Sequence, residues 1–152
     1  MRFLIALIFI AAAALPAQTP APQYVLAGGL GFNHADTPQI AGELSFGARI
    51  TDGIYSFSTL KMTGKLSTIS TGVSRRFHVS DGFTLSALLD GGLAAGGGAV
   101  GGSVSGGGML TMDVSRWSKI PGSFAYGAIR ILESPVAGGV QPAFSFGFGK
   151  VF

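Results

Sequence analysis

The chain has 152 residues, of which only 11% are charged, 47% are hydrophobic and 25 residues are glycine. Soluble domains carry about 25% charged residues, so this composition indicates one domain whose surface does not all face water. The absence of cysteine excludes disulfides and thiolate metal sites, and the net charge of +3 includes no basic run of the kind that binds nucleic acid.

The N-terminal residues have the pattern of a secretory signal peptide. A positive charge is followed by an apolar run over residues 3–15 and by Ala17, a small residue of the type found at cleavage sites. The run is too short to cross about 30 Å of hydrocarbon, which argues against a membrane anchor. We expect residues 1–17 to be removed on export, residues 18–23 to form a short lead-in, and residues 24–152 to form the domain.

The sequence after residue 23 alternates between large apolar residues and small or polar ones, a period of two that is typical of β-strands with unlike faces. Strands are predicted over residues 24–32, 39–50, 54–62 and 66–79, from residue 83 onward, and over 109–117, 123–132 and 142–152. Eight strands of this length without helical patterning predict an all-β fold, a closed antiparallel up-and-down transmembrane β-barrel.

Two of the predicted strands do not alternate cleanly. In the strand over 54–62, Tyr55 and Phe57 share one parity, whereas the large residues at its end share the other. A β-bulge near Ser58 would reconcile the two halves of this strand. The strand over 123–132 shows a similar change of parity, so its inward and outward residues are not assigned.

The turns predict which end of the barrel faces the periplasm. Tight Asp-Gly turns occur at residues 51–53 and 80–82, at the end that also holds the two ends of the barrel domain. At the other end, residues 91–108 are mostly Gly, Ala and Ser without the lysine of a phosphate-binding loop, which predicts a flexible hairpin tip, and residues 133–141 form a loop. Short periplasmic and long external connections are typical of outer-membrane barrels.

Aromatic residues gather at the predicted periplasmic ends of the strands, as in the aromatic girdles of membrane barrels. The predicted girdle consists of Tyr24, Tyr55, Phe77, Phe83, Trp117, Phe124 and Phe152. A soluble sandwich has no physical reason to place aromatic residues at one end of nearly every strand.

Charged residues share a parity with small residues, which predicts that they point into the barrel. The expected ion-pair network inside the barrel consists of Glu43, Arg49, Arg76, Asp90 and Asp113. Side chains just fill the interior of an eight-stranded barrel, and buried charges must pair to be stable. We therefore expect a packed polar interior rather than an open channel.

The strand over 142–152 carries its aromatic residues on one face: Phe144, Phe146, Phe148 and Phe152. This pattern resembles the C-terminal assembly signal of bacterial outer-membrane β-barrel proteins, although Lys150 stands where an apolar residue is usual. As architecture, residues 24–152 resemble the small eight-stranded barrels of the OmpA/OmpX type. The resemblance implies location in the bacterial outer membrane, outer-membrane lipid and the barrel-assembly machinery as partners, and a structural or interaction role without catalysis or cofactor. It names no external ligand.

Two other functions are compatible with parts of the sequence. One is a soluble secreted β-sandwich or lipocalin-like carrier, which the low charge content disfavours. The other is a barrel enzyme acting on lipid A, because His78 and Ser80 look like the His-x-Ser motif of lipid A deacylases. Asp81 stands in place of the asparagine that follows the serine in that family, and the motif falls at the predicted periplasmic end.

Overall fold

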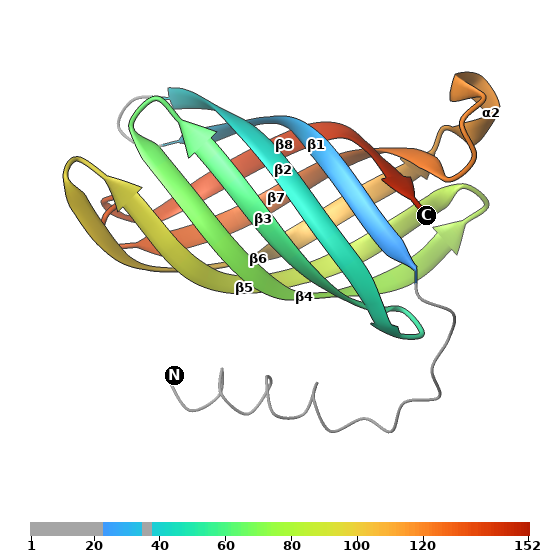
Figure 1. Ribbon diagram of the computed structural model, residues 1–152, viewed down its shortest axis with the longest axis horizontal. Helices are drawn as coiled ribbons and strands as arrows, with labels where there is room; N and C mark the ends of the chain where they lie inside the picture. Colours follow the sequence, from blue (N-terminus) through green and yellow to red (C-terminus); the bar gives the residue numbers. More distant parts are fainter. Residues whose placement is uncertain (1–22, 35–37) are drawn as a thin grey trace.

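The structure, a computed structural model, describes residues 23–34 and 38–152; the expected signal peptide and most of the lead-in lie outside these residues. Eight antiparallel strands close into a single barrel (Figure 1). Their bounds are β1 Tyr24–His34, β2 Pro38–Thr51, β3 Ile54–Thr63, β4 Leu66–Ser80, β5 Phe83–Gly96, β6 Ala99–Asp113, β7 Ser123–Ser134 and β8 Gly139–Val151. The predicted fold class, a closed antiparallel eight-stranded barrel, is confirmed.

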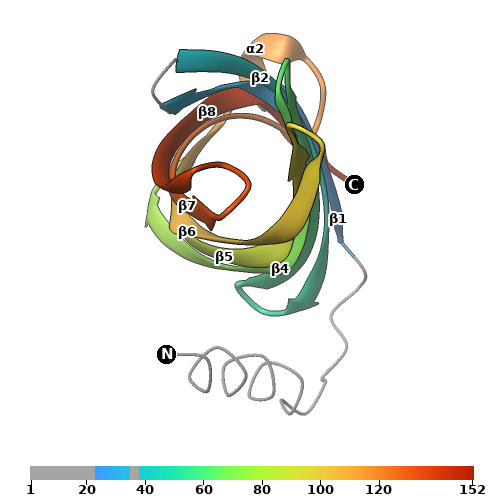
Figure 2. The same ribbon diagram turned by 90° about the vertical axis from the view of Figure 1, so that its left-hand side faces the viewer.

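The barrel closes where β1 pairs with β8, from Val25 opposite Val151 to Asn33 opposite Ala143. The end-on view in Figure 2 shows the resulting ring. Tyr24 and Phe152 continue this pairing to the rim, where the Phe152 amide donates to the Tyr24 carbonyl at 2.9 Å. Both ends of the barrel domain therefore lie at one rim, which we call the terminal rim; the opposite end is the distal rim.

Three turns at the terminal rim are joined to the neighbouring strands by backbone hydrogen bonds. Gly53, Gly82 and Gly122 have φ angles of 70°, 82° and 74°, in the left-handed region that favours glycine. The carbonyls of these three glycines accept the amides of Arg76, Asp113 and Val151 at 2.7, 2.7 and 2.9 Å. Each hairpin at this rim is therefore bonded to the strand that follows it.

The predicted bulge in the middle of β3 is wrong. β3 pairs without interruption with β4, and the register shift between β2 and β3 lies at Arg49/Thr51, beside the tight turn. β7 also pairs without a shift on both sides. These strands carry large residues on both faces because large side chains also fill the interior. Their alternation does not change parity.

The flexible tip predicted over residues 91–108 is also absent, because β5 and β6 pair up to Gly96 opposite Ala99. Only Gly97 and Gly98, both with positive φ, form the turn. The glycines inside these strands serve close packing: a Cβ at Gly92 or Gly107 would lie 2.0 Å from a carbonyl oxygen of a neighbouring strand. In this segment, glycine therefore indicates strands that pack closely against their neighbours, and not a loop. With this tip gone, the expected contrast between short and long connections is lost.

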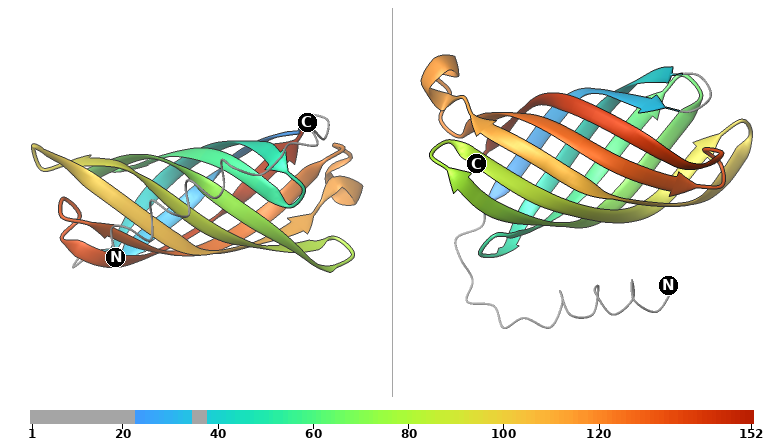
Figure 3. Two further views of the ribbon diagram at one scale, coloured as in Figure 1. Left: turned by 90° about the horizontal axis from the view of Figure 1, so that it is seen from below. Right: turned by 180° about the vertical axis from the view of Figure 1, so that it is seen from behind.

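The strand predicted over residues 109–117 ends earlier than expected. β6 stops at Asp113, and the chain then forms one helical turn, α2 (Ser115–Ser118), in the connection to β7. Figure 3 shows that α2 lies beside the terminal rim. The right-hand view of the same figure also shows the wall formed by β6, β7 and β8. This connection runs from residue 114 to residue 122.

The outer wall of the barrel is apolar along every strand. Its exposed large side chains include Leu26, Leu30, Ile40, Leu44, Phe46, Leu60, Ile69, Leu85, Leu93, Ile129, Ile131, Phe144, Phe146 and Phe148. Among the described residues, no helix is long and apolar enough to cross a membrane. Large exposed apolar residues over the whole circumference are expected for strands whose solvent is hydrocarbon.

Gly29 of β1 lies opposite Gly147 of β8 in the closing pair of strands. A Cβ at Gly29 would lie 2.3 Å from the Phe146 carbonyl oxygen and 2.5 Å from the Tyr126 hydroxyl. The absence of a side chain at this position therefore allows the strands to approach and leaves room for the Tyr126 ring inside the barrel.

We expect Gly29→Ala to lower the free energy of unfolding by at least about 1–3 kcal/mol, the usual cost of overpacking. Gly42→Ala is the matched control, because a Cβ at that position meets no atom within 4 Å. The measurement is urea unfolding in vesicles, followed by the mobility of unboiled samples on gels. Equal stability of the two variants would contradict close packing at the β1–β8 contact.

Candidate functional site

A cluster of ionisable side chains lies inside the barrel, midway along the strands. Glu43 comes from β2, Asp90 from β5 and Arg130 from β7. The Arg130 guanidinium lies 3.5 Å from the Glu43 carboxylate and 3.8 Å from the Asp90 carboxylate, and all three side chains are nearly inaccessible to solvent. Arg130 thus connects two acidic groups that come from strands on different sides of the barrel.

Further polar groups surround this ion-paired cluster. Lys61 lies directly opposite Glu43 in the β2–β3 pairing and is buried. The Ser105 hydroxyl donates to the Asp90 carboxylate at 2.7 Å. Two acidic and two basic side chains therefore occupy one buried region, so that their formal charges balance there.

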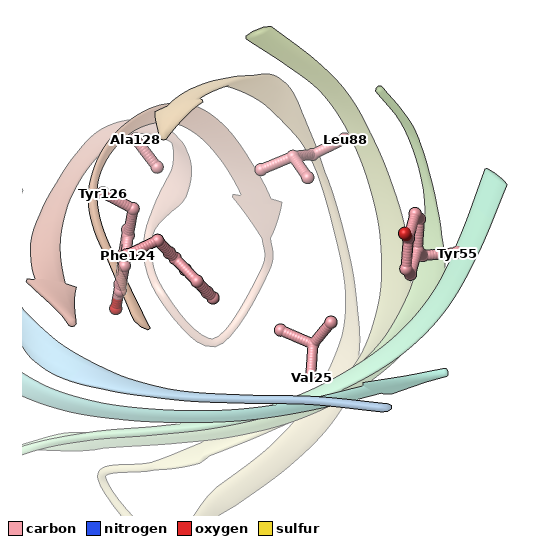
Figure 4. Close-up of a cluster of buried hydrophobic side chains, with 6 residues drawn as sticks. All are labelled: Val25, Tyr55, Leu88, Phe124, Tyr126 and Ala128. Carbon is pink, nitrogen blue, oxygen red and sulfur yellow. The ribbon is translucent and has the colours of Figure 1, made fainter. Parts of the chain in front are cut away.

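The interior near the terminal rim is apolar and aromatic. Figure 4 shows six buried side chains that converge there from several strands: Val25, Tyr55, Leu88, Phe124, Tyr126 and Ala128. Phe57 and Met109 pack against this group, which we call the apolar cluster. The interior is therefore not polar throughout, contrary to the expectation from the sequence. The apolar cluster lies between the ion-paired cluster and the terminal rim, where Arg49 and Arg76 lie beside Tyr55.

Arg76 lies at the edge of the apolar cluster. Its guanidinium carbon lies 3.8 Å from the centre of the Tyr55 ring, a distance at which a cation–π interaction is favourable. The Tyr55 hydroxyl in turn donates to the Gln23 side chain at 2.7 Å. Arg76 therefore packs on an aromatic ring and not against a carboxylate.

The structure brings together only part of the expected ion-pair network. Glu43 and Asp90 meet at Arg130, whereas Arg49, Arg76 and Asp113 lie closer to the terminal rim. The Asp113 side chain is exposed and accepts the Ser115 amide at 2.7 Å, so it holds the start of α2. Asp113 is the last residue of β6, where the strand leaves the barrel wall.

Sequence reasoning left out Lys61 and Arg130, which belong to the ion-paired cluster. Both lie in the strands whose parity was read as slipping. If every second residue after Tyr55 and after Phe124 points inward, Lys61 and Arg130 lie inside the barrel. This alternation was the signal in the sequence that could have identified them.

Five of the seven expected girdle residues lie outside the barrel near the terminal rim: Tyr24, Phe77, Phe83, Trp117 and Phe152. Tyr55 and Phe124 differ, with exposed fractions of 7% and 9% and side chains inside the barrel. The Phe124 ring fills space beside an inward-facing glycine, since a Cβ at Gly149 would lie 2.3 Å from this ring. The expected C-terminal aromatic residues Phe144, Phe146, Phe148 and Phe152 all face outward.

Larger hollows of about 260 and 240 Å³ open at the terminal rim, beside Arg76 and His78, and at the distal rim, beside Lys65 and Gln141. Between them, two small cavities remain among the interior side chains. One, of about 60 Å³, lies within the apolar cluster, and the other, of about 20 Å³, lies beside Lys61, Asp90 and Arg130. Cavities of this size hold a few water molecules. Among the described residues, no three His, Asp or Glu side chains gather as a metal site.

Comparisons with solved structures identify the fold. The barrel is similar to Ail, the attachment invasion locus protein of Yersinia pestis, with a TM-score of 0.58 and 11% identity over 86% of this chain and 97% of that one. The corresponding values for the neisserial surface protein NspA are 0.55 and 13%, over 87% and 96%. The chain has the fold of the small eight-stranded outer-membrane β-barrels.

A de novo designed transmembrane β-barrel is also similar, with a TM-score of 0.55 and 12% identity over 90% of this chain and 100% of the design. A designed sequence shares the fold without shared ancestry, so this match indicates common physical rules. No family model matches the sequence, and no curated protein matches it.

We expect Arg130→Met to lower the free energy of unfolding by about 3–5 kcal/mol, because it leaves two buried carboxylates without their shared partner. Arg116→Met, at an exposed position in α2, is the control. Neutralising the acids as well, with Glu43→Gln and Asp90→Asn, should restore part of the loss. The measurement is urea unfolding in vesicles, and equal stability of Arg130→Met and Arg116→Met would contradict a role for this cluster in stability.

Proposed function

We propose that the chain is a bacterial outer-membrane protein with a structural or interaction role. The observation that carries this proposal is the inverted distribution of side chains. Glu43, Lys61, Asp90 and Arg130 point into the barrel, whereas the outward positions of the same strands carry Leu, Ile and Phe. A soluble carrier would place its charges outside and its apolar residues inside, so the inversion favours hydrocarbon as the outer solvent.

The same arrangement supports a closed interior. The ion-paired cluster and the apolar cluster follow one another along the barrel axis, and only small cavities remain between their side chains. At the distal rim, the turn over residues 135–138 reaches over part of the opening, as Figure 2 shows, and the Gln141 side chain donates to the Ala137 carbonyl. We therefore propose a barrel that does not conduct ions.

The even number of strands puts both ends of the domain at the terminal rim, and we propose that this rim faces the periplasm, as in bacterial outer-membrane barrels. The distal rim then faces the outside, and the hairpin tips at this rim are where an external partner would bind. Similarity to Ail, which has been crystallised with the heparin analogue sucrose octasulfate, supports an interaction role of this kind. Outer-membrane lipid and, during assembly, the barrel-assembly machinery are the other partners that we propose.

We assign the protein no catalytic activity. Its buried ionisable groups pair with one another, and no cavity beside them is large enough for a substrate. His78, from the motif that resembles lipid A deacylases, is exposed near the terminal rim. Within the described part of the chain, no hydrogen bond joins His78 to Ser80, and the proposed periplasmic location is remote from lipid A.

A first test is the conductance of the purified protein in planar lipid bilayers. We expect no steady current, because the two interior clusters together obstruct the lumen. Heat-modifiable gel mobility of the same sample confirms that the barrel is folded. Stable porin-like channels from folded protein would refute the closed interior while leaving the membrane location intact.

A second test compares the two faces of β8. Phe146 is 52% exposed on the outer wall, whereas Ser145 is 6% exposed inside. Phe146→Asp removes a large apolar contact of about 1.5–3 kcal/mol and places a charge in hydrocarbon. Ser145→Asp places its charge beside the Lys61 side chain, which borders the same space near Gly31. We expect a much lower folded fraction for Phe146→Asp in outer-membrane preparations; equal fractions would contradict a lipid-facing outer wall.

A further inference from the structure

A groove lies on the outside of the barrel between the β6–β7 connection and the wall of β8, β1 and β2. It has a volume of about 720 Å³. Its walls are largely apolar: Trp117 and Ile120 belong to the connection, and Leu26, Leu44 and Phe148 belong to the strands. The connection supplies one side of the groove, and the strands supply the other.

Hydrogen bonds hold the connection in this shape. The Val114 carbonyl accepts the amides of Trp117 and Ser118 at 3.0 and 2.9 Å. The Ser118 hydroxyl accepts the Ile120 amide at 3.1 Å and lies 2.5 Å from the Ser123 hydroxyl. Val114 is buried beneath this turn. Hydrogen bonds within the chain therefore hold the side of the groove that the connection forms.

Basic residues border the groove. Lys150 is one of its lining residues, and its ammonium nitrogen lies 4.8 Å from the centre of the Phe152 ring. Lys119, which follows α2 with a φ of 58°, stands between two lining residues, and Arg116 lies in α2 itself. No acidic residue is among those that line the groove in the described part of the chain. The groove thus combines an apolar surface with positive charge at its edge.

In the membrane location proposed above, the groove lies at the depth where a lipid head group meets the hydrocarbon. Tyr24 and Phe152, at the terminal rim, have outward-facing aromatic side chains of the kind found at membrane interfaces. Trp117 is 73% exposed at the same end of the barrel. An acyl chain along the groove would therefore have its phosphate near Lys150.

We propose that this groove binds one anionic phospholipid, with an acyl chain between Trp117 and Phe148 and the head group near Lys150 and Lys119. The proposal rests on the membrane location proposed above. Phospholipid is the chemistry that fits both observations, because an apolar groove alone would accept any acyl chain, whereas the basic edge selects a head group with net negative charge.

Trp117 is the only tryptophan in the chain, so its fluorescence reports on this groove alone. The experiment places the folded protein in vesicles of phosphatidylcholine and phosphatidylglycerol at low ionic strength. In one set the phosphatidylglycerol carries brominated acyl chains, which quench tryptophan on contact, and in the other set the phosphatidylcholine carries them. At equal mole fraction of brominated lipid, we expect at least twofold stronger quenching by brominated phosphatidylglycerol.

The variant Lys119→Gln/Lys150→Gln should remove this preference while quenching by both lipids persists. Lys65→Gln, at the distal rim, is the matched control and should keep the preference. Equal quenching by the two lipids in the wild-type protein, or an unchanged preference in the double variant, would overturn the proposal. Vesicle flotation and heat-modifiable mobility test insertion separately: failure to insert refutes the membrane location itself, whereas insertion without head-group preference refutes only the lipid site.

Discussion

A closed sheet of eight strands encloses a lumen only about as wide as the side chains that fill it, and most of this structure follows from that limit. Where strands approach closely, as at Gly29 and Gly147, neither residue has a side chain. The side chains of Tyr126 and Phe124 occupy the space that Gly29 and Gly149 leave free. Small inward residues on one strand thus leave room for large inward residues on another. Side chains from many strands together fill the interior.

The apolar outer wall determines where the charges lie. A charge in the middle of a membrane strand costs less inside the barrel than against lipid, provided that it finds a partner. Arg130 supplies that partner for Glu43 and Asp90. These three residues lie on β7, β2 and β5, which are not neighbours in the sheet, so their ion pairs add contacts across the barrel to the backbone pairing around it.

The period of two was sufficient to predict the strands and the closed barrel, because a strand between two different solvents must alternate. It failed for β3 and β7, where residues of both faces are large: Phe57 and Leu60 are both apolar, although one fills the lumen and the other faces outward. Arg130 was missed for the same reason. Glycine was ambiguous too, since a residue without a side chain suits both a loop and the tight strand contact at Gly107. The helical turn at Trp117 depends on amides that donate to the Val114 carbonyl, and no alternation pattern encodes these hydrogen bonds.

The closing contact between β1 and β8 has a topological consequence. Every other strand pairing joins neighbours along the chain, and only this one joins residues more than one hundred positions apart, such as Val25 and Val151. Tyr24 and Phe152 are already hydrogen-bonded to each other. A short peptide linking these two residues would turn the barrel into a continuous ring of hairpins, which a new break at Gly97–Gly98 would open without changing any strand neighbour. In the folded barrel, the order of the strands is therefore circular. Which strand comes first depends only on where the chain is open and not on how the strands pair.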